Sequence, residues 1–111
     1  MKITFLALLL FNTISFGVSP PTGFEAIFNG KNLDGWWGLK TEDPEKWLAL
    51  PEDKFKEKWQ SSQEDIAKHW RVKNNVLIND GHGLFLSTEK NYENFELMLE
   101  YNTVAGADSG I

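Results

Sequence analysis

The chain has 111 residues, enough for one small domain, and it contains no cysteine, which excludes thiol catalysis and disulfide bonds. Sixteen acidic and eleven basic residues give a net charge of −5 with histidine neutral. This acidic balance argues against nucleic-acid binding, because a phosphate backbone requires a basic surface. The sequence also lacks a P-loop, a glycine-rich dinucleotide fingerprint and an HExxH zinc motif.

The first residues have the pattern of a secretory signal peptide. Lys2 precedes an uncharged apolar run over residues 3–11, and small residues follow before Pro20-Pro21. The run is shorter than the roughly 20 apolar residues that span a bilayer. We therefore expect residues 1–19 to be removed after Gly17 or Ser19. The protein would then be secreted or periplasmic, without stable membrane insertion. A buried N-terminal strand or helix is the alternative.

Residues 24–28 alternate between apolar and polar positions, which predicts a short strand. Two turn dipeptides, Asn29-Gly30 and Asp34-Gly35, come next. Trp36 and Trp37 follow the second turn, and we expect these large aromatic side chains to close the end of a sandwich core.

A helical segment is predicted at about residues 43–69. Asp43 can cap a first helix that begins with Pro44, where a missing N–H costs nothing. Pro51 starts a second helix in the same manner, and its apolar residues fall on one stripe: Phe55, Trp59, Ile66 and Trp70. The pattern favours a structural flap over a sheet edge, and a lid over a site is the alternative.

After the helical segment the hydrophobic period changes to two. Residues 70–80 predict a hairpin whose turn, Asn74-Asn75, tolerates positive φ. Residues 83–88 and 95–102 predict two more strands. We expect the core to receive Trp70, Val72, Phe95, Leu97, Leu99 and Tyr101. Short strands separated by turns indicate an antiparallel all-β sandwich.

Few side chains are candidates for chemistry. His69 and His82 are the two histidines, and Asp80 beside His82 could bind a metal, although two ligands do not make a site. Glu100 lies on the strand face opposite Leu97 and Leu99, and Asp108 lies where a loop would enter a next strand. These two carboxylates could form a metal site or an acid/base pair. Alternatively, Glu100 is a solvated surface residue and Asp108 a turn former.

Three stretches together resemble the N-terminal part of the 3-keto-disaccharide hydrolase domain family. They are "FEAIFNGKNLDGWWG", "HWRVKNNVLINDGHGLFLSTEKNYENFELMLEY" and "ADSGI". The family consists of exported bacterial domains with a concanavalin A-like jelly-roll sandwich. The resemblance implies an all-β antiparallel jelly roll over residues 20–111, with the helical segment as an insert. In the family the turn at 108–110 runs into a further strand, so we expect the sandwich to be incomplete in this sequence.

The resemblance also implies a carbohydrate substrate. A ketone at C3 of a glycoside acidifies the C2 proton, so a base can remove it and the C1 substituent can leave. Hydration of the unsaturated sugar then gives net hydrolysis. Asp108, at the family's polar turn, is the first catalytic candidate, and Glu100 joins it because its strand position points away from Leu97 and Leu99. His69 is a weaker candidate for base or metal ligand, since the insert could bring it over the same face. Ser109 could hydrogen-bond a sugar hydroxyl, and Gly110 lets the backbone approach the substrate closely. The cofactor stays open, and a divalent metal ion would suit polarisation of the C3 oxygen. A lectin-like binding module without catalysis is the alternative function, because the fold alone does not separate the two.

Overall fold

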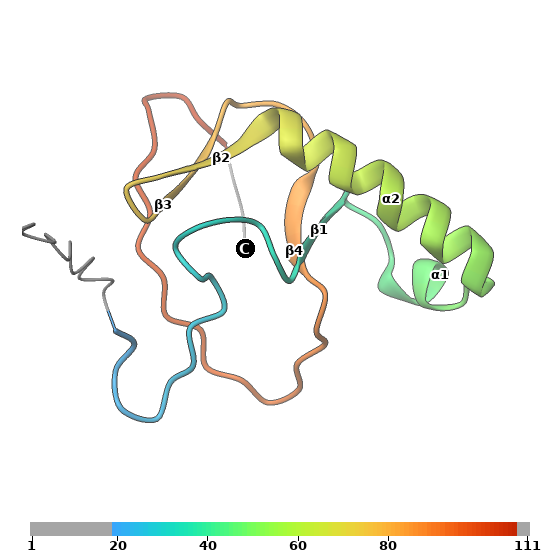
Figure 1. The fold of residues 1–111 in the computed structure, drawn as a ribbon, viewed down its shortest axis with the longest axis horizontal. Coiled ribbons are helices and arrows are strands. Elements are labelled where there is room, and N and C mark those ends of the chain that lie inside the picture. Colours follow the sequence, from blue (N-terminus) through green and yellow to red (C-terminus); the bar gives the residue numbers. More distant parts are fainter. Residues whose placement is uncertain (1–18, 109–111) are drawn as a thin grey trace, which may run out of the picture.

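The computed structural model describes residues 19–108, in which strands and helices are confined to the middle of the chain. The elements in order are β1 (Trp36–Leu39), α1 (Pro44–Leu48), α2 (Glu52–His69), β2 (Trp70–Lys73), β3 (Val76–Asn79) and β4 (Phe85–Thr88). They form two small antiparallel sheets of two strands each, β1 with β4 and β2 with β3 (Figure 1). This arrangement is compatible with a β-sandwich that carries a helical segment. The expected signal peptide, apart from Ser19, lies outside the described residues.

The helical segment begins with the cap that the sequence predicts. The side chain of Asp43 accepts a hydrogen bond of 3.0 Å from the backbone N of Glu45, and Pro44 is the first residue of α1. Pro51 precedes α2 as its N-cap residue and supplies no side-chain cap. Both helices thus begin within a residue of a proline, where a missing N–H leaves no intrahelical bond unmade.

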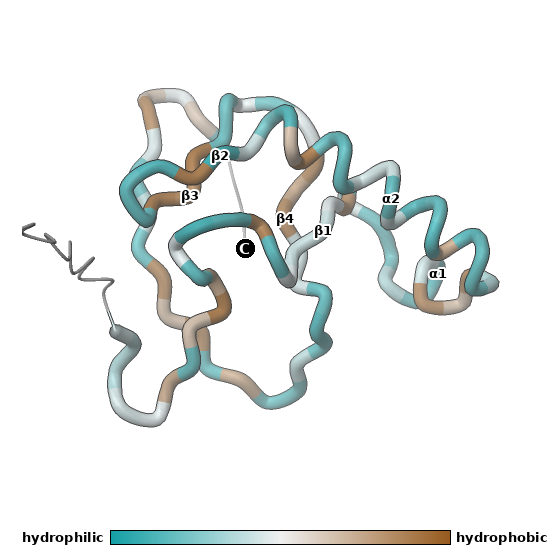
Figure 2. Tube along the Cα trace, in the orientation of Figure 1, coloured by the Kyte–Doolittle hydropathy of each residue, from teal (hydrophilic) through white to brown (hydrophobic). Residues whose placement is uncertain are grey.

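One stripe of α2 packs against β1, and Figure 2 shows that most other positions of this helix are hydrophilic. Ile66 on this stripe is only 1% exposed, and Trp37 on β1 is only 2% exposed. The hydroxyl of the buried Ser62 accepts from the backbone N of Gly38 at 3.1 Å and donates to the carbonyl of Trp59 at 2.7 Å. The helix and the sheet are therefore joined by a buried hydrogen bond as well as by apolar contact.

Strand β1 adds a strand pairing to the expectation for Trp36 and Trp37. These residues follow the turn at Asp34-Gly35, as expected, and they pair in register with Thr88 and Ser87 of β4. Only Trp37 is buried, while the indole of Trp36 donates to the carbonyl of Ile27 at 3.1 Å. The partner strand of β1 lies far along the chain, and local sequence pattern does not reveal such a pairing.

The hairpin β2–β3 has the predicted turn. Asn74 and Asn75 have φ values of 51° and 62°, as a primed two-residue turn requires. Trp70 and Val72 are less exposed than Arg71 and Lys73, so the predicted face points inward. The indole of Trp70 donates to the carbonyl of Leu84 at 2.9 Å, which fixes the hairpin to the loop before β4.

Two predicted strands are absent from the structure. Residues 24–28 and 95–101 belong to no helix or strand. The side chains expected in the core from the second segment are exposed, with Phe95 at 67%, Leu97 at 41% and Tyr101 at 79%. The predicted burial was therefore wrong for this structure. The physical reason is that a strand needs a partner for its backbone hydrogen bonds, and the strands described within residues 19–108 pair with one another and not with this segment.

None of the helices within residues 19–108 has the length and apolar character required to cross a bilayer.

Candidate functional site

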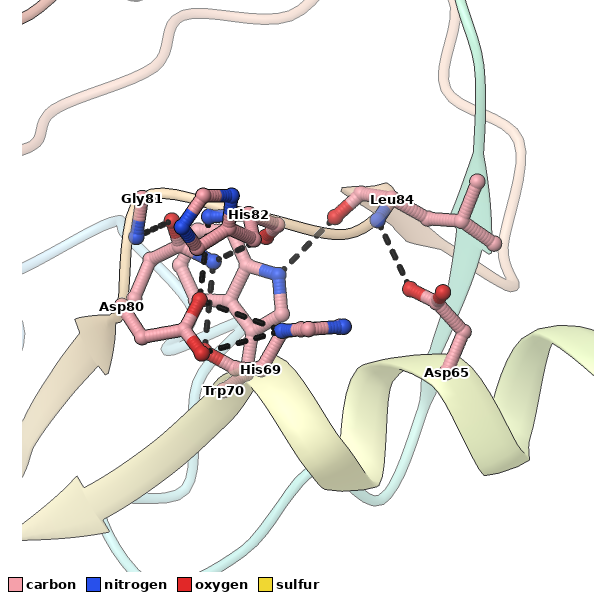
Figure 3. A network of polar contacts seen from close by, with 8 residues as sticks. Asp65, His69, Trp70, Asp80, Gly81, His82 and Leu84 are labelled. Atoms are coloured by element: carbon pink, nitrogen blue, oxygen red, sulfur yellow. Dashed lines mark hydrogen bonds and ion pairs between the residues drawn. The ribbon is translucent and has the colours of Figure 1, made fainter.

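Polar side chains gather where α2 ends and where the chain leaves β3 (Figure 3). Asp65 and His69 lie four residues apart on α2 and therefore share one helix face. Asp80 follows β3, and the antiparallel register Trp70↔Asn79 brings it beside His69. The hairpin thus places the carboxylate of Asp80 beside His69, the last residue of α2.

His69 and Asp80 form a hydrogen-bonded pair. The Nδ1 atom of His69 lies 3.0 Å and 3.2 Å from the two carboxylate oxygens of Asp80. The backbone N of Asp80 also donates to the carbonyl of His69 at 3.1 Å. The hydrogen bond from His69, supported by the backbone N–H of His82, lowers the pKa of the Asp80 carboxyl, although partial desolvation opposes this shift. Asp80 is therefore held as a carboxylate.

The pairing determines what the imidazole can do. A carboxylate on Nδ1 favours the tautomer with a proton there, which leaves the Nε2 lone pair as a proton acceptor. The His69 side chain is 28% exposed, so the ring is accessible from solvent. A histidine oriented in this way by a carboxylate has the arrangement of a general base.

The loop before β4 lies directly against the imidazole. Gly83 has a φ of 80°, and a Cβ atom there would clash with Cδ2 of His69 and lie 2.8 Å from a carboxylate oxygen of Asp65. That oxygen of Asp65 also accepts from the backbone N of Leu84 at 2.7 Å. Only glycine permits this approach, so the loop and Asp65 together fix the position of the ring.

The structure does not join Glu100 or Asp108 to this pair. Glu100 and Asp108 are exposed and lie in the part of the chain after β4 that has no helix or strand. Among residues 19–108 no hydrogen bond or ion pair joins either carboxylate to His69. Ser109 and Gly110 lie outside the described residues.

From the sequence, Asp80 was considered only together with the neighbouring His82, as an incomplete metal site. The side chain that contacts it is that of His69, and the hairpin register was the signal that could have shown this. Within residues 19–108, no three His, Asp or Glu side chains are arranged to hold a metal ion.

A comparison with protein families identifies a carbohydrate-active class. The family model described as "3-keto-alpha-glucoside-1,2-lyase-like domain" matches residues 23–111. The chain belongs to this family, and the resemblance inferred from its motifs is confirmed. No curated protein and no solved structure matches the chain.

Proposed function

We propose that this protein cleaves 3-keto-glycosides, with His69 as the general base and Asp80 as its positioning carboxylate. The supporting observation is the His69–Asp80 pair, found in a chain whose family is described as lyase-like toward 3-keto-α-glucosides. Elimination from such a substrate requires above all a base for the C2 proton.

In this proposal Nε2 of His69 accepts the C2 proton while the C1–O bond breaks and a C1=C2 double bond forms. The proton finishes on the oxygen of the leaving group. Water then adds across the double bond, with hydroxyl at C1 and hydrogen at C2, so that the net reaction is hydrolysis. The Asp80 carboxylate stabilises the imidazolium that exists between proton uptake and proton release.

The same proposal includes a jelly-roll fold and export of the protein. The two antiparallel sheets would be parts of a jelly-roll sandwich formed by residues from position 20 onward. The first 19 residues would be an export signal, as their basic start and short apolar run suggest. N-terminal sequencing of exported protein should begin after Gly17 or Ser19, and an intact Met1 would oppose export.

Turnover of a 3-keto-disaccharide, followed by chromatography of the released sugar, tests the base. His69→Gln should lower kcat by roughly 10²- to 10⁴-fold, the usual contribution of general-base catalysis. Asp80→Asn should also lower kcat, because the carboxylate that orients the ring is lost. Lys68→Ala, an exposed change in the same helical turn, is the control and should keep the wild-type rate. A folded His69→Gln variant with the wild-type rate would remove His69 from the mechanism.

Glu100 and Asp108 remain proposed catalytic side chains, and the same assay tests them. Glu100→Gln and Asp108→Ala should each reduce turnover if these carboxylates reach the substrate. Wild-type rates in both folded variants would make them bystanders. Sugar binding without any turnover in the wild-type protein would instead favour the non-catalytic, lectin-like module.

A further inference from the structure

A pocket of about 410 Å³ lies toward the opposite end of α2 from His69. This volume falls within the roughly 300–1,000 Å³ that is usual for small-molecule sites. Its lining comes from β1, α1, the first half of α2 and the segment after β4, and includes Trp37, Trp47, Glu52, Phe55, Trp59, Glu89 and Asn91. The chain thus brings four aromatic side chains, two carboxylates and one amide to one concave surface.

The aromatic side chains have different roles in this pocket. Trp37 is buried, and its ring meets that of Trp47 at 5.1 Å between centroids with an interplanar angle of 77°. Phe55 packs on Trp37 at 5.5 Å. Trp47 and Trp59 are only half-buried, so their rings supply the aromatic surface that a ligand can reach. Phe55 is half-buried in the same way, and the buried Trp37 packs against both Trp47 and Phe55.

The wall formed by Trp59 is held in place by a hydrogen bond. Its indole Nε1 donates to a carboxylate oxygen of Glu89 at 3.0 Å, which ties α2 to the residue after β4. Fixing an aromatic side chain before a ligand arrives reduces the entropy lost on binding. Glu52, Glu89 and Asn91 add hydrogen-bonding groups beside the rings.

We propose that this pocket binds a pyranose unit of a saccharide, at a site separate from His69. A pyranose has a face of C–H groups that can pack on an indole and a rim of hydroxyls that can reach carboxylates and an amide. A purely apolar ligand would desolvate Glu52, Glu89 and Asn91 without replacing their bonds to water. The choice of a saccharide as the ligand rests on the proposed function, whereas the presence of the pocket does not.

The site is too far from His69 to hold the same sugar ring. Trp59 and His69 are separated by ten residues of one helix, or about 15 Å at the helical rise of 1.5 Å per residue. The site would therefore hold a more distant unit of a longer saccharide, or a separate molecule, while chemistry occurs near His69.

The test is calorimetric titration of the purified protein with maltose, a disaccharide without the ketone, with sorbitol as an acyclic polyol that has no ring face. Maltose should bind and sorbitol should not. Trp47→Ala should weaken maltose binding roughly three- to tenfold, the range expected from losing one aromatic contact. Trp47→Phe, which keeps an aromatic face, should stay within about twofold of the wild type. Tyr101→Ala, which removes an exposed aromatic side chain outside the pocket, is the matched control.

Circular dichroism of each variant separates loss of binding from loss of folding, and Glu89→Gln gives a second measurement that leaves all the aromatic rings intact. Glu89→Gln should weaken maltose binding. The proposal would be overturned if the wild-type protein did not bind maltose, or if folded Trp47→Ala bound it equally well. The aromatic side chains of the pocket would then serve only in packing. Neither result depends on turnover, so loss of activity in His69→Gln with maltose binding retained would leave this inference intact.

Discussion

At the scale of single residues, His69 is positioned by one neighbour on its own helix and by two in the loop between β3 and β4. Asp80 holds its Nδ1 atom, Gly83 allows the loop backbone to contact its ring, and Asp65 of the same helix face anchors that loop through Leu84. Such support matters for the proposed role of His69, because a general base acts only when its geometry is fixed within narrow limits. The Asp65 and Gly83 contacts are thus positioning contacts for His69.

The lowered pKa of Asp80 predicts a dependence of stability on acid pH. A carboxyl whose pKa is lower in the folded state stabilises the fold fully above its unfolded pKa of about 3.9. This stabilisation is lost as the pH falls through the lower, folded pKa. Denaturant midpoints at pH 7 and at successively lower pH should therefore fall more steeply for the wild type than for Asp80→Asn. Asp53→Asn, an exposed change at the start of α2, is the control and should follow the wild type.

At the scale of elements, the contact of α2 with β1 depends on Gly38, because this residue has no side chain. A Cβ atom at Gly38 would lie 2.9 Å from Cγ2 of Ile66 and 2.8 Å from Cδ1 of Leu84. These distances are shorter than van der Waals contact, so helix, strand and loop meet at this glycine. A larger residue must push at least one of them away.

Gly38→Ala should therefore destabilise the protein by about 1–3 kcal/mol, the usual cost of overpacking. Urea denaturation measures this loss. In the double variant Gly38→Ala/Ile66→Ala, the second change removes one of the clashing groups, so the combined loss should be smaller than the sum of the two single losses. Strict additivity would show that the clash with Ile66 does not determine the cost.

The elements that sequence predicted correctly are those specified by neighbouring residues. Asp43 and Pro44 specify the start of α1, and Asn74-Asn75 specifies the hairpin turn. Strand β1 was missed because its partner β4 lies beyond both helices and the hairpin. The same limit applies to the site: His69 was a candidate from its type alone, but its partner Asp80 depends on strand register.

At the scale of the whole molecule, the apolar side chains divide into a small packed group and an exposed group. Trp37 and Ile66 are buried between α2 and β1, whereas Phe95, Leu97 and Leu99 are exposed on a segment without regular structure. Alternating pattern alone predicted that this segment would be part of the core. Where exposed apolar side chains form a contiguous patch, the patch marks a surface for association or aggregation.

Leu97→Ala distinguishes the sequence prediction from the structure. The alternating pattern predicts a loss of about 2–5 kcal/mol, as for a buried leucine. The observed 41% exposure predicts less than about 1 kcal/mol instead. Ile66→Ala, at a position that is only 1% exposed, is the matched comparison and should cost about 2–5 kcal/mol. Equal losses in the two variants, measured by urea denaturation, would mean that residues 95–101 are packed in solution.

The pairing of β1 with β4 also has a consequence for the order of folding. Helix α2 and the hairpin β2–β3 connect residues that are close in the chain, so they can form within microseconds. Pairing Trp36–Leu39 with Phe85–Thr88 closes a loop that contains both helices and the hairpin, and the entropy cost of closure rises with loop length. Gly38 sits at the centre of that late contact, where Ile66 and Leu84 must already be in place for the strand to dock. The last element to assemble is therefore the one that carries the most buried tryptophan, and quenching of Trp37 should report the final step of folding.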